Sequence, residues 1–219
     1  MKTTLKTESF RLGTTYIIGS YILPGELNEN INIANQSVVN VSISNCVDVI
    51  AKLQAKELDL GIIETPTFDK DIIAKEWLDD EMVICSNIEL ESFIDKEELS
   101  KYKLICQKES SPINKLIHRF FKKIDVSHRD FHSISKIDNT TASIQSVRWS
   151  KPNPEHPTIT IVSSRAIEDE VKSKILFMSR IKEYDMIRNF YIVYHKDVDM
   201  KKVEDIIKEL MKYKSEYAP

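Results

Sequence analysis

The sequence predicts a mixed α/β fold in which strands and helices alternate along the chain. Segments with the apolar spacing of strands and of helices follow one another almost from end to end. The 219 residues are 42% hydrophobic and 30% charged, which is enough apolar material for a buried core and excludes a disordered tail. This length suits one sizeable domain or two small ones, and neither a repeat nor a flexible linker divides the chain.

The first third of the chain sets the pattern. An apolar stretch from Ile17 to Leu27 has helical spacing. Residues 39–43 alternate apolar and polar, which predicts a half-buried strand, and Ser44-Asn45 then predicts the cap of a helix that begins at Cys46. The apolar run 58–63 predicts a strand covered on both faces. Strand, helix and strand in this order imply a right-handed crossover and parallel pairing.

The rest of the chain continues the alternation. Further strands are predicted at residues 72–77, 82–85, 103–106, 130–134, 158–162 and 190–194. Further helices are predicted at 96–100, at 111–123, from Asp138 or Asn139, from Ser163-Ser164 through Glu170, and from Asp199. The acidic run Asp79-Asp80-Glu81 is predicted to be a solvated turn, because nothing nearby supplies a catalytic base or nucleophile. Three prolines make 149–157 a loop.

Missing motifs exclude several classes of protein. Only four glycines occur, so the chain has no GxGxxG, GxxxxGK[ST] or GxSxG motif, and we expect no cofactor and no enzyme activity. The 31 basic and 34 acidic residues leave a net charge of −3, which predicts poor DNA binding by this chain alone. His128 and His132 stand four apart, but they fall on a predicted strand without a third ligand, so we expect no metal site.

Cysteine usage and hydropathy indicate the compartment. The three cysteines are widely spaced and form no CxxC motif, which fits a reducing environment. Met1 to Arg11 offers no apolar core for a signal peptide, and neither long uncharged stretch suits a bilayer. We therefore expect a cytoplasmic protein without membrane contact.

At this point the order and spacing of several segments resemble one family. The segments are Phe10–Thr15, Tyr21–Pro24, Ser44–Cys46 leading to Glu57–Ile63, Trp77–Ile84, Ser110-Ser111 and Phe190–Asp197. Together they resemble the effector-binding domain of LysR-type transcriptional regulators, and the ELDLGI stretch beginning at Glu57 is the most specific piece.

The resemblance implies a two-lobed fold like that of type 2 periplasmic binding proteins, with mixed sheets flanked by helices and a ligand cleft between the lobes. Lobe I would comprise residues 9–85 plus 189–219, lobe II residues 86–188, and the crossing strands near 85–87 and 187–189 would form the hinge. Family members carry a winged helix-turn-helix before this domain, for which Met1 to Ser9 leaves no room. We therefore expect a part of a longer regulator that contacts DNA only through that missing domain.

The resemblance also implies partners. A small-molecule effector would bind between the lobes, and the chain would form a homodimer or a higher homo-oligomer. Helices starting near Cys46 and Ser111 of two subunits would pack side by side and antiparallel, although core burial explains their apolar stripes equally well. The alternatives are a stand-alone solute-binding protein of a transport system, and an enzyme on the same fold such as prephenate dehydratase or a porphobilinogen-deaminase-like transferase, whose motifs are missing.

Candidate ligand-binding residues lie at helix starts and strand ends, where backbone N–H groups and the carboxyl ends of strands favour polar ligands. Those of lobe I are Thr14, Thr15, Tyr16, Ser44, Asn45, Glu64 and Thr65, and those of lobe II are Ser110, Ser111, Asn139, Thr140 and Ser163. Each hydroxyl or amide at a helix start has the alternative role of a simple cap.

Two of these positions leave their chemistry open. A Glu64 carboxylate directed into a cleft would repel a simple anion and suit an amine or hydroxyls, whereas a side chain turned outward would be an ordinary surface acid. Cys46 begins a helix, which predicts a lowered thiol pKa and makes redox sensing conceivable. The favoured interpretation of Cys46 is a small buried apolar residue.

Overall fold

The structure is a computed structural model that describes residues 9–35, 38–65, 69–109 and 111–217. Its contacts divide the chain into two compact units, each described here by itself. Unit 1 comprises the described residues up to Asp79 and those from Arg188 onward, and unit 2 runs from Asp80 to Ile187. The chain passes from one unit to the other twice, inside strand β4 (Ile72–Ser86) and at the start of strand β10 (Ile187–His195).

The sheet of unit 1 is built around strand β1 (Phe10–Thr14). Strands β2 (Val39–Ile43) and β3 (Leu60–Ile63) lie on either side of β1, and both run parallel to it. Strand β10 pairs antiparallel with β3. All four residues of β3 are buried, as the apolar run predicted. The predicted parallel direction of β2 and β3 is confirmed, but the two strands do not pair with each other, because β1 lies between them and pairs with both.

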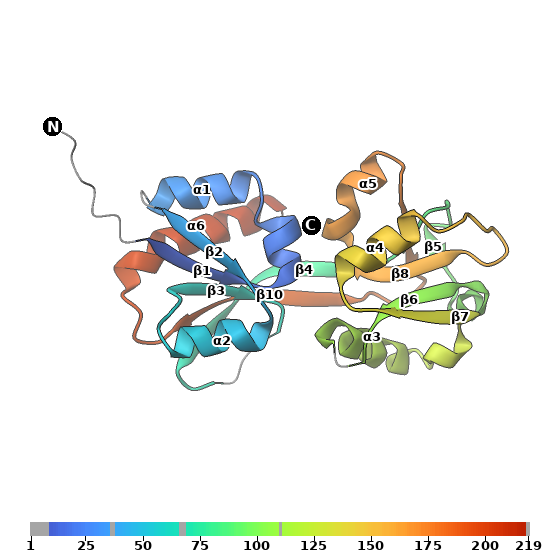
Figure 1. Cartoon of the computed structure of the whole chain (residues 1–219), viewed down its shortest axis with the longest axis horizontal. Helices are drawn as coiled ribbons and strands as arrows, with labels where there is room; N and C mark the ends of the chain where they lie inside the picture. The colour runs from blue at the N-terminus through green and yellow to red at the C-terminus, as the bar shows by residue number, and fades with distance from the viewer. Residues whose placement is uncertain (1–8, 36–37, 66–68, 110, 218–219) are drawn as a thin grey trace. The chain divides into compact units, whose positions relative to one another are not determined.

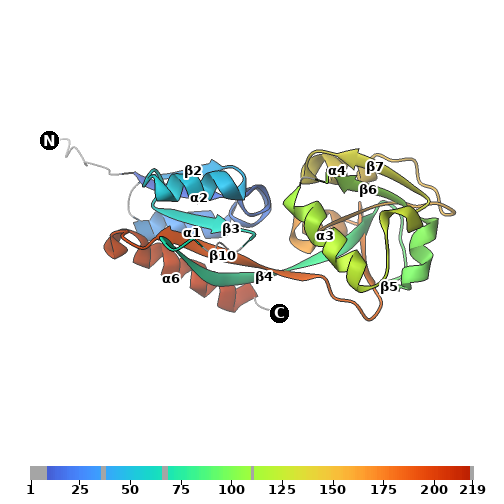
Figure 2. The same cartoon turned by 90° about the horizontal axis from the view of Figure 1, so that it is seen from below.

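Helices cover both faces of this sheet (Figure 1). Helices α1 (Glu26–Asn35) and α6 (Met200–Tyr217) lie on one face, and helix α2 (Cys46–Gln54) lies on the other, as the view from below also shows (Figure 2). A π-helical turn, Ile18–Ile22, precedes α1. Helix α6 is anchored by Trp77, whose indole Nε1 donates to the Leu210 carbonyl at 2.6 Å.

The sheet of unit 2 is mixed. Strands β6 (Lys103–Gln107), β7 (Ser133–Ile137) and β8 (Thr158–Ser163) run parallel, with β6 in the middle. Strand β4 pairs antiparallel with β8 and with β9 (Phe177–Ile181). The short strand β5 (Phe93–Ile94) pairs parallel with β9. This arrangement places the carboxyl ends of β6, β7 and β8 at one edge.

Helix α3 (Pro112–Lys123) lies on one face of this sheet and helix α4 (Thr140–Arg148) on the other (Figure 1). Phe121 of α3 is fully buried beside Phe131 in an apolar core that includes residues from β4, β6 and β8. The remaining helical segments of unit 2 are the 3-10 turns η2 (Lys96–Lys101), η3 (His128–Asp130) and η4 (Ser164–Ile167), and helix α5 (Glu168–Lys172).

Some predicted boundaries are wrong. The segments 72–77 and 82–85 form one continuous strand, β4, rather than two strands around an acidic turn. The strand predicted at 130–134 begins at Ser133 instead, because the capping box between Ser127 and Asp130 winds the preceding residues into η3. Most of α1 lies beyond the predicted helix that ended at Leu27, in a polar stretch without a clear apolar stripe.

Candidate functional site

The carboxyl ends of β1, β2 and β3 bring polar residues to one edge of unit 1. Thr14, the last residue of β1, aligns with Ile43 of β2 and Ile62 of β3. The Ser44 backbone N–H donates to the Thr14 carbonyl at 3.0 Å, and that of Thr15 donates to the Ile62 carbonyl at 3.2 Å. The lobe I candidates other than Tyr16 therefore gather here. We call Thr14, Thr15, Ser44, Asn45, Glu64 and Thr65 the unit 1 edge.

Two hydroxyls of the unit 1 edge are buried without a partner. Thr15 is 4% exposed, and neither its Oγ1 nor the buried Oγ of Ser44 has a hydrogen-bond partner among the described residues. A buried polar atom left in this state costs about 1–3 kcal/mol. A polar ligand group that reached these oxygens would recover part of that free energy.

Glu64 forms an ion pair that the sequence did not reveal. Its Oε2 accepts a hydrogen bond from Arg188 Nη1 at 2.8 Å, and the two side chains are only 16% and 7% exposed. The Arg188 guanidinium also lies over the Phe190 ring, 5.1 Å from its centroid. In the sequence, Arg188 appears only as a single basic residue before an apolar strand, and nothing links it to Glu64. The antiparallel pairing of β10 with β3 brings the two residues together.

Asn45 caps helix α2 as predicted. Its Oδ1 accepts the Asp48 backbone N–H at 2.9 Å, and its Nδ2 donates to the Asp48 carboxylate at 2.7 Å. Ser44 plays no part in this cap. Tyr16 is exposed at the start of the helical turn after β1, so its role as a ligand contact stays a prediction.

The predicted lowering of the Cys46 thiol pKa is wrong. Burial raises the pKa of Cys46, and the nearby Glu64 carboxylate raises it further, while the Thr65 carbonyl, 3.8 Å from Sγ, is a smaller opposing influence. Desolvation and a negative neighbour both disfavour the thiolate. The geometry therefore does not favour a reactive cysteine at this position.

A second polar cluster lies at the carboxyl end of β6 in unit 2. Ser111 Oγ donates to Gln107 Oε1 at 2.5 Å, and Gln107 Nε2 donates to Thr140 Oγ1 at 2.8 Å. Asn139 caps α4 by accepting the Ala142 N–H at 2.8 Å. We call Gln107, Ser111, Asn139 and Thr140 the unit 2 edge. Gln107 was not predicted, although a polar residue ending a buried strand was a usable signal.

Two further lobe II candidates stand apart from this cluster. Ser110 lies outside the described residues. Ser163 is fully buried and donates to the Asp80 carboxylate at 2.5 Å, and it makes no side-chain capping bond to the 3-10 turn that follows it. The capping role predicted for Ser163 is therefore wrong. Asp80 is itself fully buried within β4, so the prediction of a solvated turn there is also wrong.

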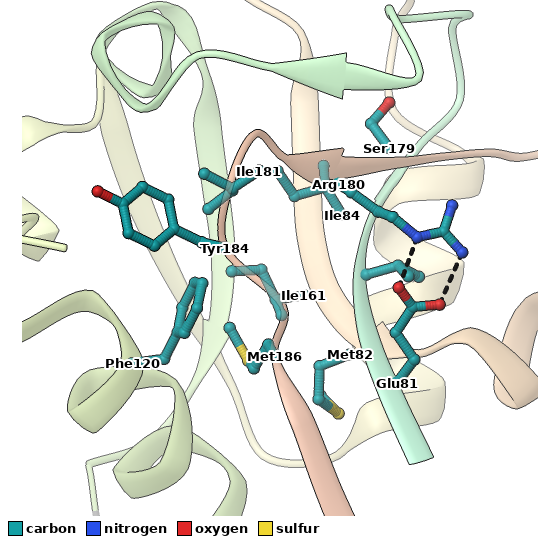
Figure 3. Close-up of a pocket in the computed structure, with 11 residues that line it drawn as sticks. Glu81, Met82, Ile84, Phe120, Ile161, Ser179, Arg180, Ile181, Tyr184 and Met186 are labelled. Carbon is teal, nitrogen blue, oxygen red and sulfur yellow. Dashed lines mark hydrogen bonds and ion pairs between the residues drawn. The ribbon is translucent and has the colours of Figure 1, made fainter. Parts of the chain in front are cut away.

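Unit 2 also contains a pocket separate from its polar edge (Figure 3). It is a small hollow with a cavity volume of about 10 Å³, lined by apolar side chains such as Phe120 and Met186 together with the Tyr184 ring. Glu81 and Arg180 lie at one side of it, where Arg180 donates to the carboxylate through Nε at 2.5 Å and Nη2 at 2.7 Å. No residue of either predicted set lines this pocket.

Four of the five histidines form two separate stacks. His128 stacks on His118 with ring centroids 6.0 Å apart, and His132 stacks on His156 at 3.7 Å. Within the described residues, no group of three or more His, Cys, Asp or Glu side chains is placed to hold a metal ion. A search of the same residues finds no helix with both the length and the apolar character needed to cross a membrane.

Comparison of the fold with solved structures finds similar proteins over nearly the whole chain. The effector-binding domain of QuiR in complex with shikimate is 18% identical with a TM-score of 0.72, covering 96% of this chain and 99% of that one. The regulatory domain of Synechocystis CcmR in complex with 2-PG is 17% identical with a TM-score of 0.74, covering 95% and 98%. The reduced regulatory domain of Pseudomonas aeruginosa OxyR is 14% identical with a TM-score of 0.75, covering 93% and 97%. These likenesses establish the fold.

Sequence comparison identifies the family. The chain is 23% identical over 192 residues to the uncharacterized HTH-type transcriptional regulator YeiE of Escherichia coli K12, covering 86% of this chain and 62% of that protein. It thus spans about three-fifths of the length of that relative. The sequence model of the LysR substrate binding domain matches residues 4–213. With the two-unit α/β fold, this match shows that the chain belongs to the LysR substrate-binding domain family.

Proposed function

We propose that this chain is the ligand-sensing part of a LysR-type transcriptional regulator. It would bind a small polar metabolite and control transcription through a winged helix-turn-helix. Family membership and the structural similarity to effector-binding domains support this role. The observation that carries the proposal is the unit 1 edge, where the carboxyl ends of three parallel strands hold two buried hydroxyls without partners.

The proposed ligand contacts follow the two polar edges. In unit 1 they are Thr14, Thr15, Tyr16, Ser44, Asn45, Glu64 and Thr65, and in unit 2 they are Ser110, Ser111, Asn139, Thr140 and Ser163. Within unit 2, Ser111 and Thr140 are favoured because their hydroxyls already bracket Gln107. Ser163 would have to exchange its bond to Asp80 for a bond to the ligand.

Binding rather than catalysis is the proposed activity. The described side chains of the two edges carry hydroxyls, amides and a carboxylate, and they contain no nucleophile hydrogen-bonded to a base. The curated relative is a transcriptional regulator, which favours this role over that of a transport component. A regulator that acts at promoters belongs in the cytoplasm, so we place the protein there.

We further propose that the chain forms a homodimer through α2 and α3, with the helices of two subunits side by side and antiparallel. The first turn of α2 carries Val47, which is 76% exposed. In the proposed dimer this side chain would be buried, which would contribute favourable free energy.

The proposed function is tested by screening ligands against thermal unfolding. Amino acids, organic acids and oxyanions are added singly to the purified chain, and a binder is expected to raise the Tm by selective binding to the folded state. Replacing the candidate hydroxyls by Thr15→Val and Ser111→Ala should each reduce that rise. Thr158→Val, at the amino end of β8 and away from both edges, is the matched control and should leave the rise unchanged.

Two results would contradict the proposal in different ways. A stabilising compound unaffected by both Thr15→Val and Ser111→Ala would place the ligand elsewhere. A chain that no compound stabilises across the three classes would contradict the ligand-sensing role itself.

A further inference from the structure

We propose that the effector carries an ammonium group that binds Glu64, so that it is an amine-bearing metabolite such as an amino acid rather than a simple organic anion. This inference rests on the proposed function and names the chemical class of ligand for the unit 1 edge. It uses the groups of unit 1 alone.

Glu64 retains capacity to accept hydrogen bonds. Across the described part of the chain it engages one partner, Arg188, and only through Oε2. A carboxylate has two oxygens with about four acceptor positions, so Oε1 is available to a ligand donor. The Glu64 side chain is 16% exposed, so part of it reaches solvent.

Arg188 exposes little of its positive charge at the edge. Its side chain is only 7% exposed, donates to Glu64 through Nη1 and lies over the Phe190 ring, while its buried Nη2 has no hydrogen bond within the described residues. The pair is neutral in sum, and its more exposed member is the carboxylate. A ligand anion arriving from solvent would meet the negative member first.

The neighbouring groups add acceptors. Thr15 Oγ1 has no partner among the described residues, and Thr15 follows β1, which pairs with β3, the strand that leads to Glu64. Ser44, whose Oγ also lacks a partner there, follows β2 on the far side of β1. An ammonium has three donor hydrogens, which suits a carboxylate with a hydroxyl at the end of the adjacent strand, since neighbouring strands lie about 5 Å apart.

The start of helix α2 is less attractive to an anion than an ordinary helix start. Asp48 in its first turn already sets a negative charge against the positive end of the helix. The Glu64 carboxylate acts on the same turn, since it contributes to raising the pKa of Cys46, the first residue of the helix. The carboxylates of Asp48 and Glu64 therefore oppose the binding of a ligand anion near this helix start.

The test compares matched pairs of compounds that differ in one group. Each amino acid is paired with the 2-hydroxy acid of the same carbon skeleton: L-alanine with L-lactate, L-serine with L-glycerate, L-aspartate with L-malate, and L-phenylalanine with L-phenyllactate. Both members of a pair keep the carboxylate, so any difference in affinity reports on the ammonium. We expect a stabilising amino acid to bind at least about tenfold more tightly than its hydroxy acid, measured by thermal shift and calorimetry.

Three variants assign that difference to Glu64. Glu64→Gln should lower the affinity for the amino acid about tenfold or more, while Glu64→Asp, which keeps the charge, should preserve the preference for the amine. Glu57→Gln removes an exposed carboxylate from the same unit and should change nothing. The Tm of each variant without ligand shows whether the loss of the bond to Arg188 has altered folding. If Glu64→Gln does not fold, the test rests on whether Glu64→Asp keeps the preference for the amine.

The outcomes separate this inference from the proposed function. Hydroxy acids that bind as tightly as their amino acids, or a stabilising anion that binds Glu64→Gln as well as the original chain, would overturn the amine inference and leave the ligand-sensing role standing. If no amino acid stabilises the chain but an organic acid or an oxyanion does, the amine inference is overturned and the ligand-sensing role stands. Failure of all three classes would contradict both.

Discussion

Asp59 and Arg11 form an ion pair in unit 1 that reverses the effect of burial on the pKa of the carboxylate. Burial alone would raise the pKa of Asp59, but its oxygens accept hydrogen bonds from the Arg11 backbone N–H at 2.8 Å, Nε at 3.1 Å and Nη2 at 2.8 Å. These bonds, helped by the positive charge, outweigh burial and hold the pKa of Asp59 below its ordinary value.

Asp59→Asn is expected to destabilise the chain in a pH-dependent way. Because the folded-state pKa is lowered, the ionised pair stabilises the fold above the unfolded pKa of about 3.9, and this contribution is lost as the pH falls through the lower folded pKa. The variant should lose about 1–3 kcal/mol of unfolding free energy at pH 7. Urea unfolding should show the difference shrinking below about pH 4.

The exposed Glu91→Gln serves as the control for loss of a carboxylate and should show no such trend. A difference between Asp59→Asn and the original chain that grew as the pH fell would contradict the sign of this linkage.

Cys46 offers a second residue-scale prediction, since both burial and Glu64 raise the pKa of its thiol. Fewer thiolates are therefore present at pH 8 than in an unperturbed cysteine, and alkylation by iodoacetamide should be correspondingly slow. Glu64→Gln should lower the apparent pKa and speed the reaction, which rates measured from pH 7 to pH 10 would show.

The Cys46→Ser variant measures the background alkylation of the other two cysteines. Both are buried, and burial is the main cause that raises the pKa of Cys85 to about 12. An apparent pKa for Cys46 below about 8.5 would contradict the expectation and reopen redox sensing.

At the scale of elements, α2 packs closely on the sheet of unit 1 because glycine occupies the contact. A Cβ at Gly61 would lie 2.8 Å from Val193 Cγ2 and 2.9 Å from Val49 Cγ1, which is closer than such atoms approach. Val49 and Leu53 of α2 are fully buried against this surface. The packing of the helix on the strand therefore requires a residue without a Cβ at position 61.

Gly61→Ala is expected to lower the unfolding free energy by about 1–3 kcal/mol through overpacking. Val193→Ala removes the closest clashing methyl group, so the double variant should be more stable than the sum of the two single losses predicts. Denaturant unfolding of all four proteins measures this coupling. Additive losses would show that the contact at Gly61 does not limit the packing.

Strand β4 explains why its acidic run was mistaken for a turn. Asp79 is exposed, the fully buried Asp80 accepts a hydrogen bond from Ser163, and the partly buried Glu81 pairs with Arg180. Each charge that would break an isolated strand has a place on the surface or a partner on β8 or β9. The hydropathy of residues 79–81 carries no information about those distant partners, so it cannot predict that the strand continues through them.

At the scale of the whole molecule, the proposed dimer leads to a test of assembly. Val47→Glu places a charge on the exposed first turn of α2 and should shift the chain toward monomer in sedimentation at matched concentration, because a charge buried in an interface is costly. Ile175→Glu, another exposed apolar position and one outside α2 and α3, should leave the assembly unchanged. An original chain that sediments as a monomer would contradict the proposed dimer.

The sequence by itself determined the fold class, the parallel arrangement of the first strands and the polar strand ends of unit 1, because apolar periodicity and strand ends are local properties. Only the tertiary structure decided which groups meet. Glu64 and Arg188 are 124 residues apart, and Ser163 and Asp80 are 83 apart, so strand pairing rather than sequence spacing brings them together. The physical reason is that burial and ion pairing depend on neighbours supplied by the fold, and these neighbours set the charge of the candidate site.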